Sequence, residues 1–262
     1  MLRRAAVLGS PVGHSLSPAL HRAAWAAVGF EGSYDARECP AEALPGVLAE
    51  VRGDEAWVGL SLTMPLKEVV LGLVDEVSPR AASLGTANTV LRRPDGSLWA
   101  TSTDGDGVLA AVQAVGAPAG PVAILGAGGT ARAALGVLPE AVVVARSAAR
   151  AAILGAPVVT WSDFRAGSYA LVVSTTPSGA TDGLAESRWP ADVALVDVVY
   201  DPWPTRLGSA ALSAGAAVCG GLEVLVGQAV EQVELMTGRR PDPAVLRAAG
   251  ESQLAGRARP DG

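Results

Sequence analysis

The sequence has few residues of the types that build metal centres and disulfide frameworks. Its 262 residues include two cysteines, Cys39 and Cys219, and two histidines, His14 and His21. The cysteines lie far apart, and no Cys/His set has the spacing of a zinc site. We therefore expect no bound metal, reduced thiols and a cytoplasmic protein.

Long apolar runs and clusters of positive charge are also missing. Half of the residues are hydrophobic, yet no stretch approaches the roughly 20 uninterrupted apolar residues of a membrane span. The first segment, MLRRAAVLGSPVGHS, has an apolar run too short for a signal peptide and suits a first strand better. The net charge of −6 is opposite to that of a nucleic-acid-binding surface. The composition predicts a globular protein that binds neither membranes nor nucleic acid.

Glycine is plentiful, and the most informative stretch of the chain depends on it. An apolar run at 122–125 is followed by Gly126, Gly128 and Ala131 in the pattern G-x-G-x-x-A, with an alanine-rich helical segment after it. This is the pattern of a dinucleotide-binding strand–turn–helix, in which the glycines allow a tight turn and a close approach of the backbone to pyrophosphate. An ordinary glycine turn in an α/β protein is the alternative. We expect the cofactor loop to comprise Gly126, Ala127, Gly128, Gly129, Thr130 and Ala131.

The next apolar run indicates which dinucleotide is bound. Residues 141–145 end at Arg146, with Ser147 beside it and Arg150 one helical turn later, where a protein that binds NAD would carry Asp or Glu. A guanidinium group can hold a 2′-phosphate bidentately, whereas a carboxylate would repel it. We predict NADP(H) as the cofactor. Two solvated surface arginines are the alternative.

Apolar runs that suit strands alternate with helical patterns along the whole chain. In the second half the runs are nearly continuous, as in parallel strands that are buried on both faces. We predict an α/β protein with two lobes, an N-terminal α/β substrate domain over 1–103 and a Rossmann-type NADP-binding domain over 104–221. Helical patterns at 222–236 and 243–249 exceed what a nucleotide domain needs. We expect 222–262 to complete the first domain, with a cleft between the lobes.

Polar residues in the first half form three clusters. Ser15 and Ser17 lie in a loop that leads into a helix, with Ser17 at the expected N-cap and Pro18 at the first helical position. Two hydroxyls and free backbone N–H groups suit a small carboxylate. A capping serine with a solvated neighbour is the alternative.

The second cluster is Ser61, Thr63 and Lys67, directly after an apolar strand. Lysine is nearly absent from this chain, in which the basic residues are overwhelmingly arginine. Lysine can exchange a proton and arginine cannot, so Lys67 is a candidate for acid–base chemistry. A solvated helix lysine is the alternative.

The third cluster joins Asn88 and Thr89 to Thr103 and Asp104. Asp104 heads a predicted helix, so it is either an N-cap or a partner that faces Lys67 across a substrate hydroxyl.

Eight segments together resemble the shikimate dehydrogenase family, in the family's order and at similar spacing. They are SLSP, SLTMPLK, GTANT, STDGDG, GAGGTA, ARSAAR, VDVVYDPWPTRL and GLEVLVGQA, and they run over nearly the whole chain. SLSP resembles the family's loop that binds the substrate carboxylate. ARSAAR resembles the family's segment that binds the 2′-phosphate of the cofactor.

The resemblance implies the NADPH-dependent, reversible reduction of 3-dehydroshikimate to shikimate, a step towards chorismate and the aromatic amino acids. It implies Lys67 and Asp104 as the catalytic pair. The small-molecule substrate would be bound by Ser15, Ser17, Ser61, Thr63, Asn88, Thr103, Tyr200 and Gln228. The cofactor loop would be joined by Arg146, Ser147, Arg150, Ser174, Thr175, Val198 and Gly221. We expect a monomer or a homodimer.

A few positions depart from the family pattern. Ser61 and Ser102 stand where asparagine is usual, and Ala145 replaces the asparagine before Arg146. Near the nicotinamide, Val224 replaces the usual methionine and Glu223 a small residue. These departures leave two alternatives open. One is a paralogue that acts on quinate or an aminoshikimate, and the other is a non-catalytic, NADP-responsive binding protein.

Overall fold

The computed structural model describes residues 2–186 and 188–257, without the side chain of Arg150. The chain divides into two compact units. Unit 1 comprises Met1–Thr103 and Gln228–Gly262, and unit 2 comprises Asp104–Gly227. The second boundary falls inside one helix, α9 (Gly221–Thr237).

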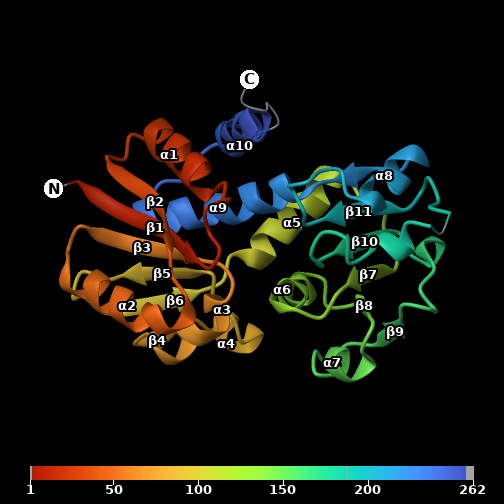
Figure 1. Ribbon diagram of the computed structural model, residues 1–262, viewed down its shortest axis with the longest axis horizontal. Helices are drawn as coiled ribbons and strands as arrows, with labels where there is room; N and C mark the ends of the chain where they lie inside the picture. Colours follow the sequence, from red (N-terminus) through yellow and green to blue (C-terminus); the bar gives the residue numbers. More distant parts are fainter. Residues whose placement is uncertain (1, 187, 258–262) are drawn as a thin grey trace. The chain divides into compact units, whose positions relative to one another are not determined.

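Unit 1 is built on a mixed sheet of six strands in the order β2-β1-β3-β5-β6-β4 (Figure 1). β1 pairs in parallel with β2 and β3, whereas β5 pairs antiparallel with β3 and β6. The strands are β1 (Arg3–Gly9), β2 (Gly32–Glu38), β3 (Trp57–Leu62), β4 (Glu76–Val77), β5 (Thr89–Arg92) and β6 (Leu98–Thr101). The helices are α1 (Ser17–Ala27), α2 (Leu44–Gly53), α3 (Leu66–Val69), α4 (Pro79–Leu84), the second half of α9 and α10 (Pro243–Arg257).

Alternating side chains of these strands serve two different layers. Leu8, Leu60 and Leu62 point into a core that they share with α2, including Leu44 and Val51. Residues one position along each strand face the layer of α1, α9 and α10, where α1 lies beside α10 (Figure 1). Because successive side chains of a strand point to opposite faces of the sheet, one face packs on an apolar core and the other faces the layer that holds the polar site described below.

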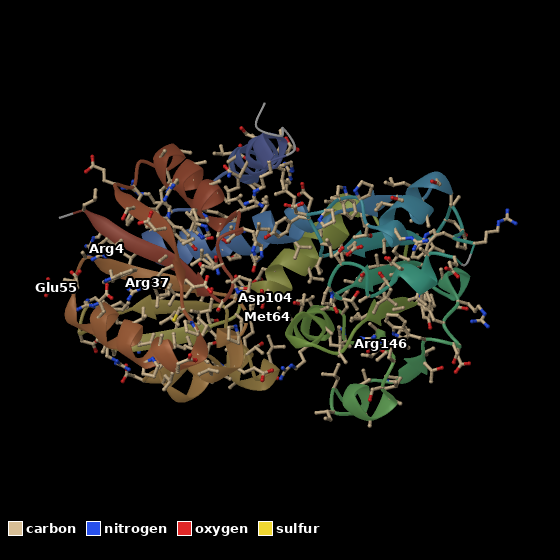
Figure 2. All side chains as sticks on the ribbon, in the orientation of Figure 1. Arg4, Arg37, Glu55, Met64, Asp104 and Arg146 are labelled. Atoms are coloured by element: carbon tan, nitrogen blue, oxygen red, sulfur yellow. The ribbon has the colours of Figure 1, made fainter. Side chains whose placement is uncertain are left out.

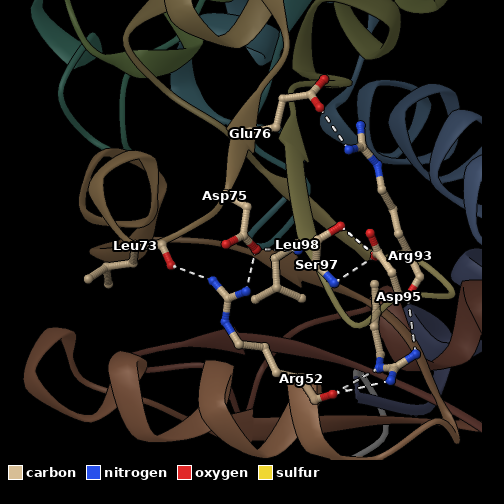
Figure 3. Close-up of polar contacts among 9 residues, drawn as sticks. Arg52, Leu73, Asp75, Glu76, Arg93, Asp95, Ser97 and Leu98 are labelled. Atoms are coloured by element: carbon tan, nitrogen blue, oxygen red, sulfur yellow. Dashed lines mark hydrogen bonds and ion pairs between the residues drawn. The ribbon is translucent and has the colours of Figure 1, made fainter.

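Ion pairs attach α2 to the sheet. Glu50 pairs with Arg4 of β1 and with Arg37 of β2, both labelled in Figure 2. At the end of the helix, Arg52 pairs with Asp75 and also donates to the Leu73 carbonyl (Figure 3). These pairs are partly exposed, so we expect each of them to contribute little to stability.

Unit 2 is built on an all-parallel sheet in the order β12-β11-β10-β7-β8-β9. Its strands are β7 (Val122–Leu125), β8 (Val142–Ala145), β9 (Val158–Thr160), β10 (Leu171–Ser174), β11 (Ala194–Asp197) and β12 (Val218–Cys219). Its helices are α5 (Asp104–Val115), α6 (Gly129–Val137), α7 (Ala148–Ala152) and α8 (Arg206–Ser213). From β7 the chain first runs outward through β8 and β9, and then crosses to the other side of β7 for β10 to β12. The direction thus reverses between β7 and β10, the place where open α/β sheets bind ligands.

Both faces of this sheet are buried. Ile124, Val173 and Val196 pack with α5, α6 and the first turn of α9. Their neighbours Leu125 and Val172 pack with α8 and with Phe164. This explains the nearly continuous apolar runs in the sequence. The prediction of an α/β protein with an N-terminal α/β domain and a Rossmann-type domain is confirmed, and the structure adds that the first sheet is mixed.

Among the residues described, no helix is both long and apolar enough to span a bilayer. Cys39 and Cys219 are both buried free thiols.

Candidate active site

Ser15 and Ser17 form the turn at the start of α1. The Ser17 N–H donates to Ser15 Oγ at 3.2 Å, so Ser15 closes the turn and Leu16 is the N-cap. The prediction of Ser17 as N-cap is therefore wrong by one position, because Ser17 is already the first residue of the helix and its N–H is bonded to the Ser15 hydroxyl. Ser17 is buried, and its carbonyl binds His21 Nδ1 at 2.9 Å.

Lys67 lies in a short turn that the backbone holds at both ends. The Thr63 N–H donates to the Leu8 carbonyl at 2.9 Å, and the Ala87 N–H donates to the Lys67 carbonyl at 2.8 Å. Thr63 can lie against β1 only because Gly9 has no side chain, since a Cβ there would be 2.2 Å from Thr63 Cγ2. Lys67 is half-buried. The turn of Lys67 is thus bonded directly to the segment that carries Asn88.

Asn88 is the centre of a buried polar cluster at the start of β5. Its Nδ2 donates to Gln228 Oε1 at 3.0 Å and to Thr103 Oγ1 at 3.1 Å. Its Oδ1 accepts from the Thr103 N–H at 2.9 Å and from Thr89 Oγ1 at 2.8 Å. Three of the residues predicted from the sequence, Asn88, Thr103 and Gln228, are therefore in direct contact. We call these residues, with Ser15, Ser17, Ser61, Thr63 and Lys67, the polar cluster.

Asp104 and Tyr200 belong to unit 2, unlike the other predicted substrate and catalytic residues. Asp104 is buried at the first position of α5, where a carboxylate is favoured by the helix dipole. Tyr200 is half-buried in the loop after β11.

The glycine loop has the backbone geometry that the sequence pattern requires. Gly126 has a φ of +115°, and a Cβ at this position would lie 2.7 Å from Thr175 Oγ1. Thr175 in turn donates through Oγ1 to the Leu125 carbonyl at 2.8 Å. A Cβ on Gly128 would meet nothing within 4 Å. Gly128 is the N-cap of α6, and the first N–H groups of a helix have no partner within the helix. This arrangement fits a dinucleotide pyrophosphate.

Further predicted cofactor residues lie at the carboxyl ends of the other parallel strands of unit 2. Arg146 directly follows β8 and is exposed (Figure 2), with its Cζ 5.6 Å from the centroid of the Trp161 ring. Gly221 lies so close to Val198 that a Cβ would be 2.1 Å from the Val198 carbonyl oxygen. Ser174 ends β10 and is buried, and Ser147 is exposed beside Arg146. The side chain of Arg150 lies outside the described residues. We call the loop 126–131 with these residues and Thr175 the glycine-loop cluster.

Burial perturbs the pKa of groups beneath these clusters. His21 is fully buried, and desolvation lowers its pKa to about 4, so its ring is neutral at pH 7. Burial raises the pKa of Tyr34, whose ring stacks on His21 with centroids 3.9 Å apart. In unit 2, burial raises the pKa of Asp197, which accepts from Thr205 Oγ1 at 2.7 Å.

Two residues that contact these clusters were missed by reasoning from the sequence. Gln232 bonds to Ser61 and Thr89, and Trp161 lies under Arg146. Gln232 follows Gln228 by four residues, which places both on one helix face and is the signal that could have revealed it. Nothing in the sequence pairs Trp161 with Arg146. In the described residues, no group of three or more His, Cys, Asp or Glu side chains could hold a metal.

Two family models match this chain. The shikimate dehydrogenase substrate binding domain matches residues 7–90, and the shikimate 5′-dehydrogenase C-terminal domain matches residues 221–249. A shikimate dehydrogenase (NADP(+)) of Thermus thermophilus is 41% identical over 264 residues, covering 96% of this chain and 98% of the relative. The chain belongs to the shikimate dehydrogenase family.

Solved structures support the same assignment. Shikimate 5-dehydrogenase from T. thermophilus, in complex with NADP(H) and shikimate, is 41% identical, has a TM-score of 0.86 and covers 96% of this chain and 99% of its own. The Mycobacterium tuberculosis shikimate dehydrogenase is 37% identical, has a TM-score of 0.83 and covers 96% and 99% of the two chains. The predictions of the family and of an NADP-dependent oxidoreductase are confirmed.

Proposed function

We propose that this shikimate dehydrogenase reduces 3-dehydroshikimate to shikimate, reversibly and with NADPH, and that Lys67 and Asp104 are its catalytic pair. The observation that carries the proposal is the backbone bond between the Lys67 carbonyl and Ala87. This bond connects the turn of Lys67, the one lysine of the chain, to the segment of Asn88. The proposed proton donor, Lys67, and the proposed hydroxyl-binding residue, Asn88, are thereby held near each other.

The polar cluster suits the two ends of such a substrate. Ser15 and Ser17, at the start of α1, bind the carboxylate through hydroxyl and N–H groups. Asn88 and Gln228 bind ring hydroxyls through their amides, and Thr63 binds beside Lys67. Ser61, Thr103 and Tyr200 complete the proposed set.

Bound NADPH supplies the hydride for the ketone carbon. Lys67 donates a proton or a hydrogen bond to the oxygen on which negative charge develops. Asp104 orients the lysine and the adjacent hydroxyl as an acceptor. The reverse reaction uses the same groups in the opposite sense.

The glycine-loop cluster binds the cofactor in this proposal. The open N–H groups at Gly128 and Gly129 receive the pyrophosphate, and Arg146 with Ser147 and Arg150 receives the 2′-phosphate. Thr175, Ser174, Val198 and Gly221 line the same edge of the sheet. The buried free thiols of Cys39 and Cys219 support a cytoplasmic location.

Initial rates with a panel of substrates test the activity. We expect turnover of shikimate with NADP+ to exceed that of quinate and aminoshikimate, and NADP+ to be strongly preferred over NAD+. Equal rates with the two cofactors would refute the role of Arg146. Turnover of quinate alone would replace the substrate assignment, and turnover of none of them would favour a binding protein.

Because the chain has one lysine, its ε-amine can be observed without interference from others. Reductive ¹³C-methylation should give one lysine signal in addition to that of the terminal amine. We expect shikimate to shift the lysine signal in the presence of NADP+. The Lys67→Arg protein, which should show only the terminal signal, is the control for the assignment. A lysine signal that does not respond to saturating shikimate would remove Lys67 from the site.

A further inference from the structure

We propose that Gln232 is a positioning residue that, together with the Thr103 N–H, holds the Asn88 amide, and through it Gln228, in a single orientation for the substrate. This inference depends on the proposed role of Asn88 in substrate binding. Gln232 lies in α9 and is 4% exposed. Its side chain connects the two strands whose ends carry Lys67 and Asn88.

Both ends of the Gln232 amide are bonded. Oε1 accepts from Ser61 Oγ at 2.9 Å. Nε2 donates to the Asn88 carbonyl at 3.2 Å and to Thr89 Oγ1 at 2.9 Å. Ser61 and Thr89 are register partners on the antiparallel strands β3 and β5. Gln232 therefore bridges this strand pair on the layer opposite the apolar core.

The helix face explains why a side chain at 232 reaches this point. Gln228, Gln232 and Met236 are spaced four residues apart, so they form one stripe along α9. Gln228 contacts Asn88, and at the other end of the stripe Met236 lies over Gly59 of β3. A Cβ at Gly59 would lie 3.2 Å from Met236 Cε and 2.6 Å from the Val90 carbonyl oxygen. The absence of a side chain at Gly59 leaves room for the end of the Met236 side chain against β3.

The hydrogen bonds form a chain that runs in one direction. Tyr34 donates to Ser61 at 2.7 Å, and Ser61 donates to Gln232. Gln232 donates to Thr89, which donates to Asn88 Oδ1 at 2.8 Å. We call this chain, from Tyr34 to Asn88, the relay.

Backbone groups fix the direction of the relay. The Asn88 carbonyl can only accept, so the group of Gln232 that faces it must be the NH₂. The Thr103 N–H can only donate, so the group of Asn88 that faces it must be Oδ1. The hydroxyls between these amides then have a single consistent orientation.

Two consequences for recognition follow. Asn88 Nδ2 donates to Thr103 Oγ1 and to Gln228 Oε1, and because Gln228 Oε1 accepts this bond, Gln228 turns its own NH₂ towards the proposed site. The proposed site therefore offers the substrate a donor at this end, the Gln228 NH₂, and this group recognises oxygens that accept. A hydroxyl can accept, whereas an ammonium group cannot. The relay thus favours shikimate over its amino analogues. Ser61 contributes to substrate recognition only through the relay, because its hydroxyl already donates a hydrogen bond to Gln232.

The relay also connects to the carboxylate end of the polar cluster. His21 stacks on Tyr34 and binds the Ser17 carbonyl. This stacking holds the ring of Tyr34 in place. It therefore also fixes the Tyr34 hydroxyl, which is the first donor of the relay.

Gln232→Met and Gln232→Glu test the proposal. Methionine keeps the length of the side chain and removes every hydrogen bond. Ionised glutamate still accepts from Ser61 but donates to neither Thr89 nor the Asn88 carbonyl, and protonated glutamate can donate only one of these two bonds. We expect Gln232→Met to raise the KM for shikimate about tenfold. We expect Gln232→Glu to reduce the preference for shikimate over aminoshikimate, while both variants keep the KM for NADP+ within about twofold of the wild-type value.

Val233→Ala is the matched control, because Val233 is the next residue of α9, is fully buried and has no part in the relay. It should lower the melting temperature and leave the KM for shikimate within about twofold. If both Gln232 variants leave KM and selectivity unchanged, the proposal is wrong. It is also wrong if Val233→Ala raises the KM for shikimate as much as Gln232→Met does at a similar loss of melting temperature.

Asn88→Ala separates the two proposals. If it leaves the KM for shikimate unchanged, the proposed substrate site fails. If it raises KM and the Gln232 variants do not, only the relay fails. Should Gln232→Met not fold, Tyr34→Phe replaces it, since it removes only the first donor and keeps the ring stacked on His21. We then expect about a threefold rise in KM, and an unchanged value would refute the relay.

Discussion

The polar cluster of unit 1 and the glycine-loop cluster of unit 2 are built from different parts of the chain. In the first, buried side chains bond to one another, and Asn88 alone makes hydrogen bonds to Thr89, Thr103 and Gln228 through its amide. In the second, the backbone around Gly126 and Gly128 does most of the positioning, and the charged group, Arg146, is exposed. The polar cluster depends on which side chains are present to bond to one another. The glycine-loop cluster depends on the conformation of the backbone.

The difference predicts how the two clusters respond to substitution. A change in the polar cluster leaves a buried donor or acceptor unpaired, which affects stability as well as recognition. A change at an exposed residue of the glycine-loop cluster affects the cofactor and little else. The predictions below, in order of decreasing effect, test this contrast.

Replacement of Lys67 should have the largest effect. Lys67→Met removes the proposed proton donor, and we expect kcat to fall by about 10²- to 10⁴-fold. Binding of NADPH, measured by fluorescence titration, should be unchanged because the residue belongs to unit 1. A kcat close to that of the wild type would mean that another group moves the proton.

Alanine substitutions at Gly126 and Gly128 should distinguish the requirement for a positive φ from the requirement for space next to the cofactor. Gly126→Ala places a side chain at a φ of +115° and 2.7 Å from Thr175 Oγ1, so both stability and NADP+ binding should fall. Gly128→Ala meets nothing within 4 Å, so the fold should be kept. We expect Gly128→Ala to raise the KM for NADP+ about tenfold at an unchanged melting temperature, because the methyl group occupies space next to the pyrophosphate. Unchanged NADP+ binding in both variants would contradict the assignment of the loop.

Arg146→Leu should weaken the cofactor preference. The loss of a charge-assisted bond to the 2′-phosphate costs about 1.5–3 kcal/mol, so the ratio of kcat/KM for NADP+ over NAD+ should fall roughly 10- to 160-fold. The melting temperature without cofactor should hardly change, since the side chain is exposed. A selectivity ratio equal to that of the wild type would assign the preference to Ser147 and Arg150.

The residues of the glycine-loop cluster follow a local sequence rule, whereas the contacts inside the polar cluster do not, for a physical reason. Gly126, Arg146 and Thr175 each follow an apolar strand, and parallel strands bring their carboxyl ends to one edge. Gln232 reaches Ser61 across 171 positions of the sequence, which no local pattern records. Strand β4 was missed because two residues are too few to show a period, and α10 runs on to Arg257, beyond the predicted end at Ala249.

Acid should destabilise unit 1 through His21. The pKa of His21 is about 4 in the folded protein and 6.5 in the unfolded chain, so between these values the unfolded chain binds more protons. Stability therefore falls as pH decreases through this window, by about 3 kcal/mol in total. His21→Gln keeps a donor for the Ser17 carbonyl and does not titrate. Urea unfolding at pH 7 and about pH 4.5 should show a smaller loss for this variant than for the wild type, and equal losses would assign the acid sensitivity to other groups.

The smallest expected effect concerns the ring beneath Arg146. Trp161 lies 5.6 Å from the guanidinium carbon, which suits a cation–π contact worth about 0.5–1 kcal/mol at an exposed site. The contact restricts the rotamers of Arg146, so less entropy is lost when a phosphate binds. Trp161→Leu should raise the KM for NADP+ about two- to fivefold and leave the KM for NAD+ unchanged, whereas Trp161→Phe should retain most of the affinity. A parallel rise for both cofactors in Trp161→Leu would show instead that Trp161 supports the fold of β9 and not the conformation of Arg146.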